Sequence, residues 1–138
     1  MRHGEPVFVD TGAWAALALT RDPLHDRARE TWEQLSSVGA RFHTSIPVVM
    51  ETFTFLDRNT SRTTALRWKH SLSTVPRLKV LPCGHRELQG AWPYFERANL
   101  HKLSVTDAVS FVLMKGRGMR TAFAFDSHFA AAGFRMVG

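Results

Sequence analysis

Short apolar runs alternate with longer amphipathic segments along the whole chain. Five runs predict strands: VFVD at 7–10, RFHTS at 41–45, LKVLP at 78–82, RTAFAF at 120–125 and FRMV at 134–137. Strands separated by helices need crossover connections, which make neighbouring strands parallel. The pattern therefore predicts an α/β protein: a three-layer α/β/α sandwich with a central, mostly parallel sheet of about five strands.

Helical spacing fills the intervals between these runs. Helices are expected at 22–37, 46–58, 61–72, 85–98, 104–115 and 127–133, besides one directly after the first strand. In the first of these intervals Asp22 is the expected N-cap and Pro23 the first helical residue. An apolar stripe follows on one face: Leu24, Ala28, Trp32 and Leu35. Pro93 is expected to kink or split the helix at 85–98.

Length and composition fit one domain, residues 1–138, with a substantial core. The single cysteine, Cys83, excludes an internal disulfide, which favours a reducing compartment and a cytoplasmic location. The first residues show neither a signal peptide nor a membrane span. Eighteen basic and twelve acidic residues give a net charge of +6, which favours a polyanionic partner such as RNA.

Four carboxylates stand at positions that suggest a shared site. Asp10 ends the first predicted strand and Asp126 the fourth, and strand ends flanking a reversal of strand order form the usual crevice of a parallel sheet. Asp107 lies in the first turn of its helix. Glu51 is the only formally charged residue between Arg41 and Asp57, so its own helix offers no basic partner at i±3 or i±4.

Helix capping is the competing explanation for three of these acids. Asp10 and Asp126 can each serve as N-caps, and Asp107 can complete a capping box with Ser104. Four acids around one crevice, however, repel one another unless a multivalent cation neutralises them. Ligands that offer only oxygen atoms favour hard ions, which predicts Mg²⁺ or Mn²⁺.

The chain resembles the PIN domain family in the order of these motifs: DTG at 10–12, the helical Glu51, SVTDA at 104–108 and FDSHF at 125–129. Its size is similar to that of the VapC type, the toxin half of toxin–antitoxin pairs. The resemblance implies a Mg²⁺- or Mn²⁺-dependent endoribonuclease, a frequent homodimer and an inhibitory antitoxin protein, with no membrane partner.

This resemblance also suggests roles for individual residues. Asp10 and Asp107 are the expected primary metal ligands, Asp126 a further ligand, and Glu51 a ligand through water or an orienter of the nucleophile. Two hydroxyls are candidates to hydrogen-bond these carboxylates: Thr11 and Ser127. Some relatives carry a further acid where this chain has His128, for which a structural role is expected.

Basic residues surround an indole in the segment at 58–70. The candidate substrate-binding residues are Arg58, Arg62, Arg67 and Lys69. These side chains can track an RNA strand with a base stacked on Trp68. Alternatively, they form a solvated helix face while Trp68 points into the core.

Two other function classes compete with the nuclease. A receiver-type phosphoacceptor domain needs an Asp after the third strand, and LKVLPCG offers none. A non-catalytic RNA- or protein-binding module with the same fold is the remaining alternative. The G-x-G of KGRG, at 115–118, precedes a strand and is interpreted as a turn.

Overall fold

A five-stranded parallel sheet forms the centre of the computed structural model, which describes residues 3–138. The strands are β1 (Pro6–Val9), β2 (Arg41–Ser45), β3 (Lys79–Leu81), β4 (Thr121–Phe123) and β5 (Arg135–Val137). They lie in the order β3-β2-β1-β4-β5, and each neighbouring pair is parallel. The predicted α/β fold is confirmed.

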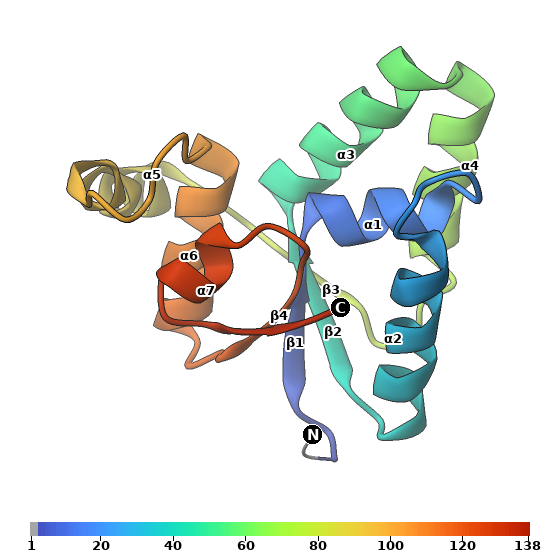
Figure 1. Cartoon of the computed structure of the whole chain (residues 1–138), viewed down its shortest axis with the longest axis horizontal. Helices are drawn as coiled ribbons and strands as arrows, with labels where there is room; N and C mark the ends of the chain where they lie inside the picture. The colour runs from blue at the N-terminus through green and yellow to red at the C-terminus, as the bar shows by residue number, and fades with distance from the viewer. Residues whose placement is uncertain (1–2) are drawn as a thin grey trace.

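Helices cover both faces of this sheet, as Figure 1 shows: α1 to α4 lie on one side and α5 to α7 on the other. Their bounds are α1 (Thr11–Ala18), α2 (His25–Ser37), α3 (Ile46–Asn59), α4 (Arg62–Leu72), α5 (His85–Ala91), α6 (Val105–Gly116) and α7 (His128–Ala131), with a 3-10 helix at Trp92–Glu96. Among the described residues, none of the helices has the length and apolar character needed to cross a membrane.

The central strand explains the apolar run near the N-terminus. Val7, Phe8 and Val9 of β1 are fully buried, because helices cover the strand from both sides. On one side Phe111 of α6 packs edge-on against Phe129 of α7, with ring centroids 5.0 Å apart. These contacts fix α6 and α7 over β4 and so place the residues at their N-terminal ends.

Serine caps begin three of the helices. The hydroxyls of Ser45, Ser61 and Ser104 accept hydrogen bonds from backbone N–H groups in the first turns of α3, α4 and α6. Such caps satisfy N–H groups that have no partner inside the helix. They fix where each helix leaves the edge of the sheet.

Two predicted boundaries were wrong. The helix expected from Asp22 begins at His25, because the Asp22 carboxylate accepts a 2.8 Å hydrogen bond from the Leu24 N–H and forms a turn instead of a cap. Strand β4 ends at Phe123, so Asp126 lies in the turn before α7 and not at the strand end. The predicted break at Pro93 is confirmed by the 3-10 helix there.

Strand order reverses beside β1, because the chain passes from β1 to β2 and β3 on one side and then to β4 and β5 on the other. The carboxyl ends of β1 and β4 are joined there by a 3.0 Å hydrogen bond from the Asp10 N–H to the Phe123 carbonyl. This is where parallel sheets usually bind ligands.

Candidate metal centre

Asp10 occupies the N-cap position of α1 but does not cap it. Its side chain makes no capping hydrogen bond, and the residue is only 5% exposed. One carboxylate oxygen, Oδ1, is buried and has no hydrogen-bond partner among the described residues. The Thr11 and Gly12 N–H groups favour the ionised form of Asp10, but they leave Oδ1 without a partner, and a buried carboxylate oxygen without a partner is costly.

Asp107 lies at the third residue of α6, where its backbone N–H donates 3.0 Å to the Ser104 hydroxyl. That cap uses the backbone of Asp107 and leaves its carboxylate for other contacts. The carboxylate is almost completely buried and lies beside the turn that precedes α7, 3.7 Å from His128. The first turn of α6 thus directs an acid toward the turn containing Asp126.

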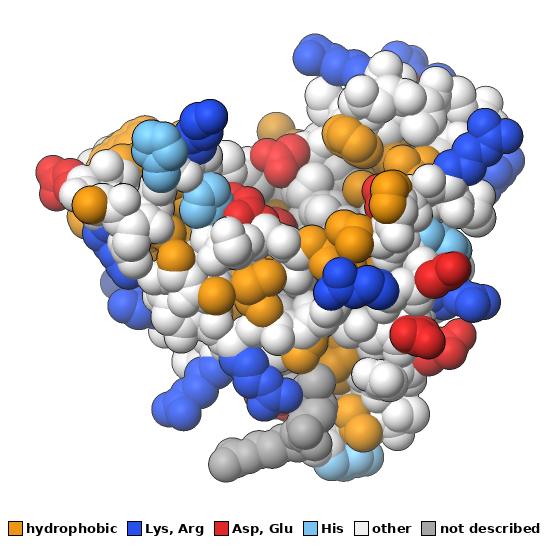
Figure 2. All heavy atoms as spheres, in the orientation of Figure 1, with side chains coloured by type: hydrophobic (Ala, Val, Ile, Leu, Met, Phe, Trp, Pro, Cys, Tyr) orange, Lys and Arg blue, Asp and Glu red, His pale blue; other side chains and the backbone are white. Residues whose placement is uncertain are grey.

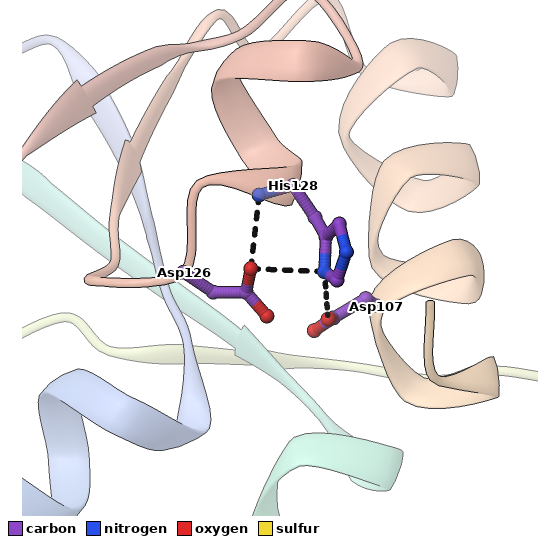
Figure 3. A group of neighbouring side chains, drawn as sticks. All are labelled: Asp107, Asp126 and His128. Carbon is purple, nitrogen blue, oxygen red and sulfur yellow. Dashed lines mark hydrogen bonds and ion pairs between the residues drawn. The ribbon is translucent and has the colours of Figure 1, made fainter. Parts of the chain in front are cut away.

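Asp126 and His128 form a tight turn, shown in Figure 3. The Asp126 Oδ1 accepts 2.9 Å from the His128 N–H and lies 2.9 Å from its Nδ1. The other ring nitrogen, Nε2, lies 2.6 Å from the His101 carbonyl oxygen, which can only accept a hydrogen bond. Nε2 therefore carries a proton, and Nδ1 faces the carboxylates of Asp107 and Asp126.

Glu51 lies on α3, and its side chain is exposed. It lines a hollow of about 590 Å³ together with Arg58 and Thr106. Its negative charge contributes to the raised pKa of both Asp10 and Asp107. Glu51 forms no ion pair among the described residues, so no other segment of the described chain supplies the basic partner that its own helix lacks.

Burial raises the pKa of two carboxyls in this cluster. The pKa of Asp10 rises to about 7, mainly because the group is buried, with the negative charges of Glu51 and Asp126 adding to the rise and the Thr11 N–H opposing it. The pKa of Asp107 rises to about 8 through burial and the charges of Asp10 and Asp126. Both shifts express the cost of ionising several acids together in one place.

The pKa values of Asp126 and His128 shift toward the charged form of each group. Burial works against ionisation of Asp126, but the His128 N–H and the contacts with Asp107 and the His128 ring lower its pKa overall. The His101 carbonyl, opposed by burial and aided by Asp126, raises the pKa of His128. Both shifts favour the charged forms, so the His128 ring and the Asp126 carboxylate stabilise each other's charge.

The structure thus brings Asp107, Asp126 and His128 together at the carboxyl edge of the sheet, and the negative charges of Asp10 and Glu51 act on Asp107 there. Figure 2 shows acidic side chains in the hollow between the helices on the two sides of the sheet, with basic side chains on the rims of this hollow. One ligand atom from each of Asp107, Asp126 and His128 lies within 4.8 Å of the other two. Such an arrangement suits a small divalent cation.

The two predicted hydroxyl partners do not contact these carboxylates. The Thr11 hydroxyl is buried without a hydrogen-bond partner among the described residues. Ser127 is exposed, and its side chain makes no capping hydrogen bond at α7. Their suggested role in orienting the acids stays a prediction.

The residues of the basic segment at 58–70 lie in different environments. Trp68 is only 5% exposed and packs against Trp14, so the suggestion that an RNA base stacks on it was wrong and the core interpretation was right. Arg62 is paired with Asp57. The side chains of Arg67 and Lys69 are exposed, whereas Arg58 lines the hollow that contains Glu51.

His128 is the residue whose place in the site sequence reasoning missed. Its position two residues after Asp126, where some relatives carry an acid, was the available signal. A histidine at a helix start has many structural roles, so the sequence favoured a structural role. Only the folded chain shows that its Nδ1 faces two of the four carboxylates.

The chain is similar to known proteins along most of its length. Residues 7–135 match the family model described as the PIN domain. The chain is 36% identical over 129 residues to the 23S rRNA-specific endonuclease VapC20 of Mycobacterium tuberculosis. The aligned region covers 93% of this chain and 95% of the relative.

Solved structures extend the comparison. The crystal structure of M. tuberculosis VapC20, described as a sarcin-ricin loop cleaving toxin, superposes with a TM-score of 0.82 at 32% identity, covering 93% of this chain and 95% of that one. VapBC2 from Rickettsia felis, bound to a promoter DNA fragment, gives 0.70 at 11% identity, covering 95% and 96%. FitAcB from Neisseria gonorrhoeae gives 0.69 at 15%, covering 96% of both. These last two support the fold alone.

Proposed function

Because the chain belongs to the PIN domain family, we propose that it is a Mg²⁺- or Mn²⁺-dependent endoribonuclease and the toxin of a VapBC-type toxin–antitoxin pair. The observation that carries this proposal is the buried carboxylate cluster with an unpartnered Asp10 oxygen. A protein that only gripped RNA would gain nothing from burying like charges together, since they repel the phosphates as well as one another.

The residues present fit a divalent cation. Asp10, Asp107 and Asp126 supply carboxylate oxygens, and the raised pKa values of the first two report a site that lacks positive charge. When bound, such an ion lowers the pKa of its water and polarises a phosphate oxygen. Carboxylate oxygens favour Mg²⁺ and Mn²⁺ over softer metals.

His128 is a further candidate ligand. The His101 carbonyl holds the Nε2 proton, so a neutral ring presents its Nδ1 lone pair to the space beside Asp107 and Asp126. A ring nitrogen oriented by a backbone carbonyl is the usual arrangement of a histidine that binds metal. Because nitrogen suits Mn²⁺ better than Mg²⁺, His128 favours Mn²⁺ among the two expected ions.

The other side chains of the hollow have roles toward substrate. Glu51 is exposed and has no ion pair among the described residues, which supports a role in accepting a proton from a water molecule or in orienting it for attack. Arg58 lines the same hollow and can contact a phosphate oxygen from the rim. Arg62, Arg67 and Lys69 extend the positive surface along α4, where they stay candidate contacts to the RNA backbone.

Ribosomal RNA is the substrate to test first, because the relative with 36% identity is named as a 23S rRNA-specific endonuclease and its crystal structure as a sarcin-ricin loop cleaving toxin. Without the four clustered acids, eighteen basic residues face eight acidic ones, a net charge of +10. Such a surface supplies affinity for RNA without reading its sequence.

Two protein partners belong to the same proposal: an antitoxin and a second copy of the chain. Apolar side chains on α3 give such partners a surface, since Ile46, Met50 and Phe55 are 45%, 63% and 40% exposed. Expression of the chain from its native locus together with the flanking open reading frames, followed by purification and mass measurement, tests the antitoxin. The mass of the free chain tests the homodimer.

Cleavage of a sarcin-ricin loop hairpin by wild type and Asp10→Asn tests the function. We expect cleavage by the wild type with Mn²⁺ or Mg²⁺, none with a chelator, and none by Asp10→Asn, which loses one oxygen ligand while keeping its shape. Equal cleavage by both proteins would refute the assignment of the site. A folded wild type that cuts no RNA under any condition would favour the binding module.

A further inference from the structure

A second charged hollow lies at the opposite end of the sheet from the acidic cluster. It measures about 1010 Å³ and is bounded by the first residues of β1, β2, β4 and β5 and by the turn after α6. Its cationic lining residues are Arg41, Lys115, Arg120 and Arg135. In Figure 1 this is the end near the N-terminus, and Figure 2 shows basic side chains there. We name it the distal basic hollow.

The register of the parallel sheet explains why these cations gather. Arg41 of β2 pairs with Pro6 of β1, and Thr121 of β4 pairs with the next residue, Val7, so Arg120 stands level with Arg41 across β1. Arg135 of β5 pairs with Thr121 and donates its N–H to the Arg120 carbonyl. Two steps between strands separate Arg41 from Arg120 by about 10 Å.

Little negative charge balances Arg41, Lys115 and Arg120. Among the described residues Glu5 is the only acid that lines the hollow, and one of its carboxylate oxygens accepts a 2.7 Å hydrogen bond from the Thr121 hydroxyl. Arg41 donates to the Gly4 carbonyl and not to an acid. Within residues 3–138, Arg41, Lys115 and Arg120 form no ion pair, and all three are exposed.

Helix stabilisation accounts for one of these residues only. Lys115 lies in the last turn of α6, where a cation interacts favourably with the helix dipole. Arg41 and Arg120 lie at the starts of strands, where no helix end needs them. Lys115, the first residue of the KGRG motif, lies at the end of α6 and lines the hollow.

We infer that the distal basic hollow binds phosphates of an RNA at a distance from the cleavage site. This rests on the proposed function, which makes RNA the substrate. Three separate cations, Arg41, Lys115 and Arg120, the first and last of which lie about 10 Å apart across the sheet, match several phosphates along a strand better than one small anion. The acidic cluster repels RNA until a cation neutralises it, so attraction has to come from surfaces of this kind.

A matched pair of double variants tests the inference. Lys115→Gln with Arg120→Gln removes two charges from the hollow, and Arg21→Gln with Arg29→Gln removes two exposed charges from the region of α2. Binding to a long 23S rRNA fragment is measured as a function of salt without divalent metal, so that the RNA stays intact. Thermal unfolding of each variant shows that it is folded.

We expect the hollow variant to bind the long RNA about tenfold more weakly and to reduce the slope of log Kd against log salt by about 1.5. The control variant should change both quantities much less. Cleavage of a short hairpin with Mn²⁺ should stay within twofold of wild type for both variants, because a short RNA does not reach the hollow.

Equal losses in the two double variants would overturn the inference, because they would show only the effect of net charge. Unchanged binding of the hollow variant would overturn it as well. Since binding is measured without metal, a chain that failed to cut any RNA would disprove the proposed function and still give a result for the hollow.

Discussion

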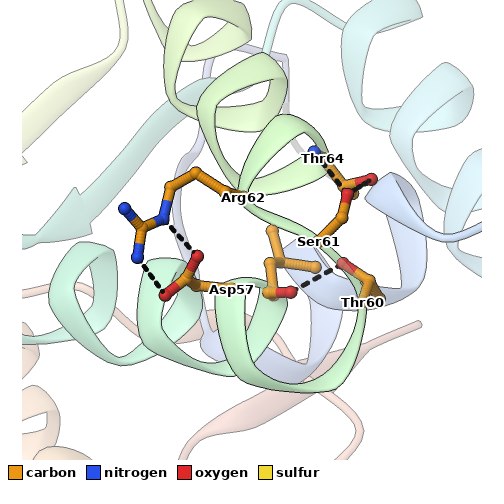
Figure 4. A network of polar contacts seen from close by, with 6 residues as sticks. Asp57, Thr60, Ser61, Arg62 and Thr64 are labelled. Atoms are coloured by element: carbon orange, nitrogen blue, oxygen red, sulfur yellow. Dashed lines mark hydrogen bonds and ion pairs between the residues drawn. The ribbon is translucent and has the colours of Figure 1, made fainter.

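Two charged regions of this molecule satisfy their polar groups in opposite ways. In the hairpin of α3 and α4, drawn in Figure 4, partners lie within the segment: Arg62 pairs with Asp57, Ser61 caps α4 through Thr64, and the Thr60 hydroxyl bonds the Leu56 carbonyl. In the acidic cluster, Asp107 and Asp126 meet at His128, the charges of Asp10 and Glu51 act on Asp107, and an Asp10 oxygen has no partner in the described part of the chain. The first region is complete by itself, whereas the second requires a cation.

RNA cleavage should distinguish the acidic cluster from the hairpin of α3 and α4 most strongly. Asp107→Asn keeps the size of the side chain and its backbone cap but removes a proposed metal ligand, so we expect RNA cleavage to fall by more than about 100-fold, beyond the usual cost of losing a partner that only orients a ligand. Asp57→Asn removes an acid from the self-contained region and should leave cleavage within about twofold. The comparison fails if both variants lose activity to a similar extent.

Metal should stabilise only the region that lacks a cation. At one hundred times its dissociation constant, Mn²⁺ is expected to raise the melting temperature of wild type by about 5 to 10 °C, because it binds the folded state alone. Asp107→Asn should show a much smaller rise, and Asp57→Asn the full one. A wild-type melting curve unmoved by millimolar Mn²⁺ would contradict the cation site.

The pH dependence of the metal-free protein gives a third comparison. Asp10 and Asp107 have pKa values of about 7 and about 8 in the folded state against 3.8 without the fold, so the folded chain holds these protons more tightly. Their contribution to stability is complete below about pH 4 and is lost as pH rises to about 8. Asp107→Asn stays neutral, so the free energy of unfolding should decrease less over this range.

Chemical denaturation at pH 5 and pH 8 in the presence of a chelator measures this difference. Wild type should lose more stability than Asp107→Asn between the two values. A parallel loss in both proteins would show that Asp107 ionises normally in the fold and that the cluster is not electrostatically strained.

The smallest effect is expected at the ion pair of the self-contained region. Arg62 and Asp57 meet at the surface, where water and salt screen their attraction. Arg62→Gln should therefore shift the melting temperature by about 2 °C or less. A much larger shift would mean that the hairpin of α3 and α4 depends on this pair and that the contrast with the acidic cluster is overstated.

Local pattern was sufficient to predict most of the fold. Alternation of apolar runs and amphipathic segments predicted five parallel strands in β-α order, and the serine cap before Asp107 fixed the start of α6. The motif order predicted the family correctly. Boundaries failed where a side chain formed a turn in place of a cap, as Asp22 did before α2.

The site was only partly predictable because its contacts join distant segments. The isolation of Glu51 among apolar neighbours was visible in the sequence, and so was the recurrence of acids after strands. The approach of His128 to Asp107 depends on how α7 packs against α6 through Phe129 and Phe111, a contact that no local pattern encodes. For the same reason the sequence did not decide whether Trp68 faced RNA or the core.

A crystal structure of the wild type grown with Mn²⁺, with an anomalous difference map recorded near the manganese absorption edge, shows whether the acidic cluster binds a divalent cation. We expect one strong peak among the carboxylates of Asp10, Asp107 and Asp126. A map without a peak there, in which His128 still lies against Asp126 as the only counter-charge, would contradict it.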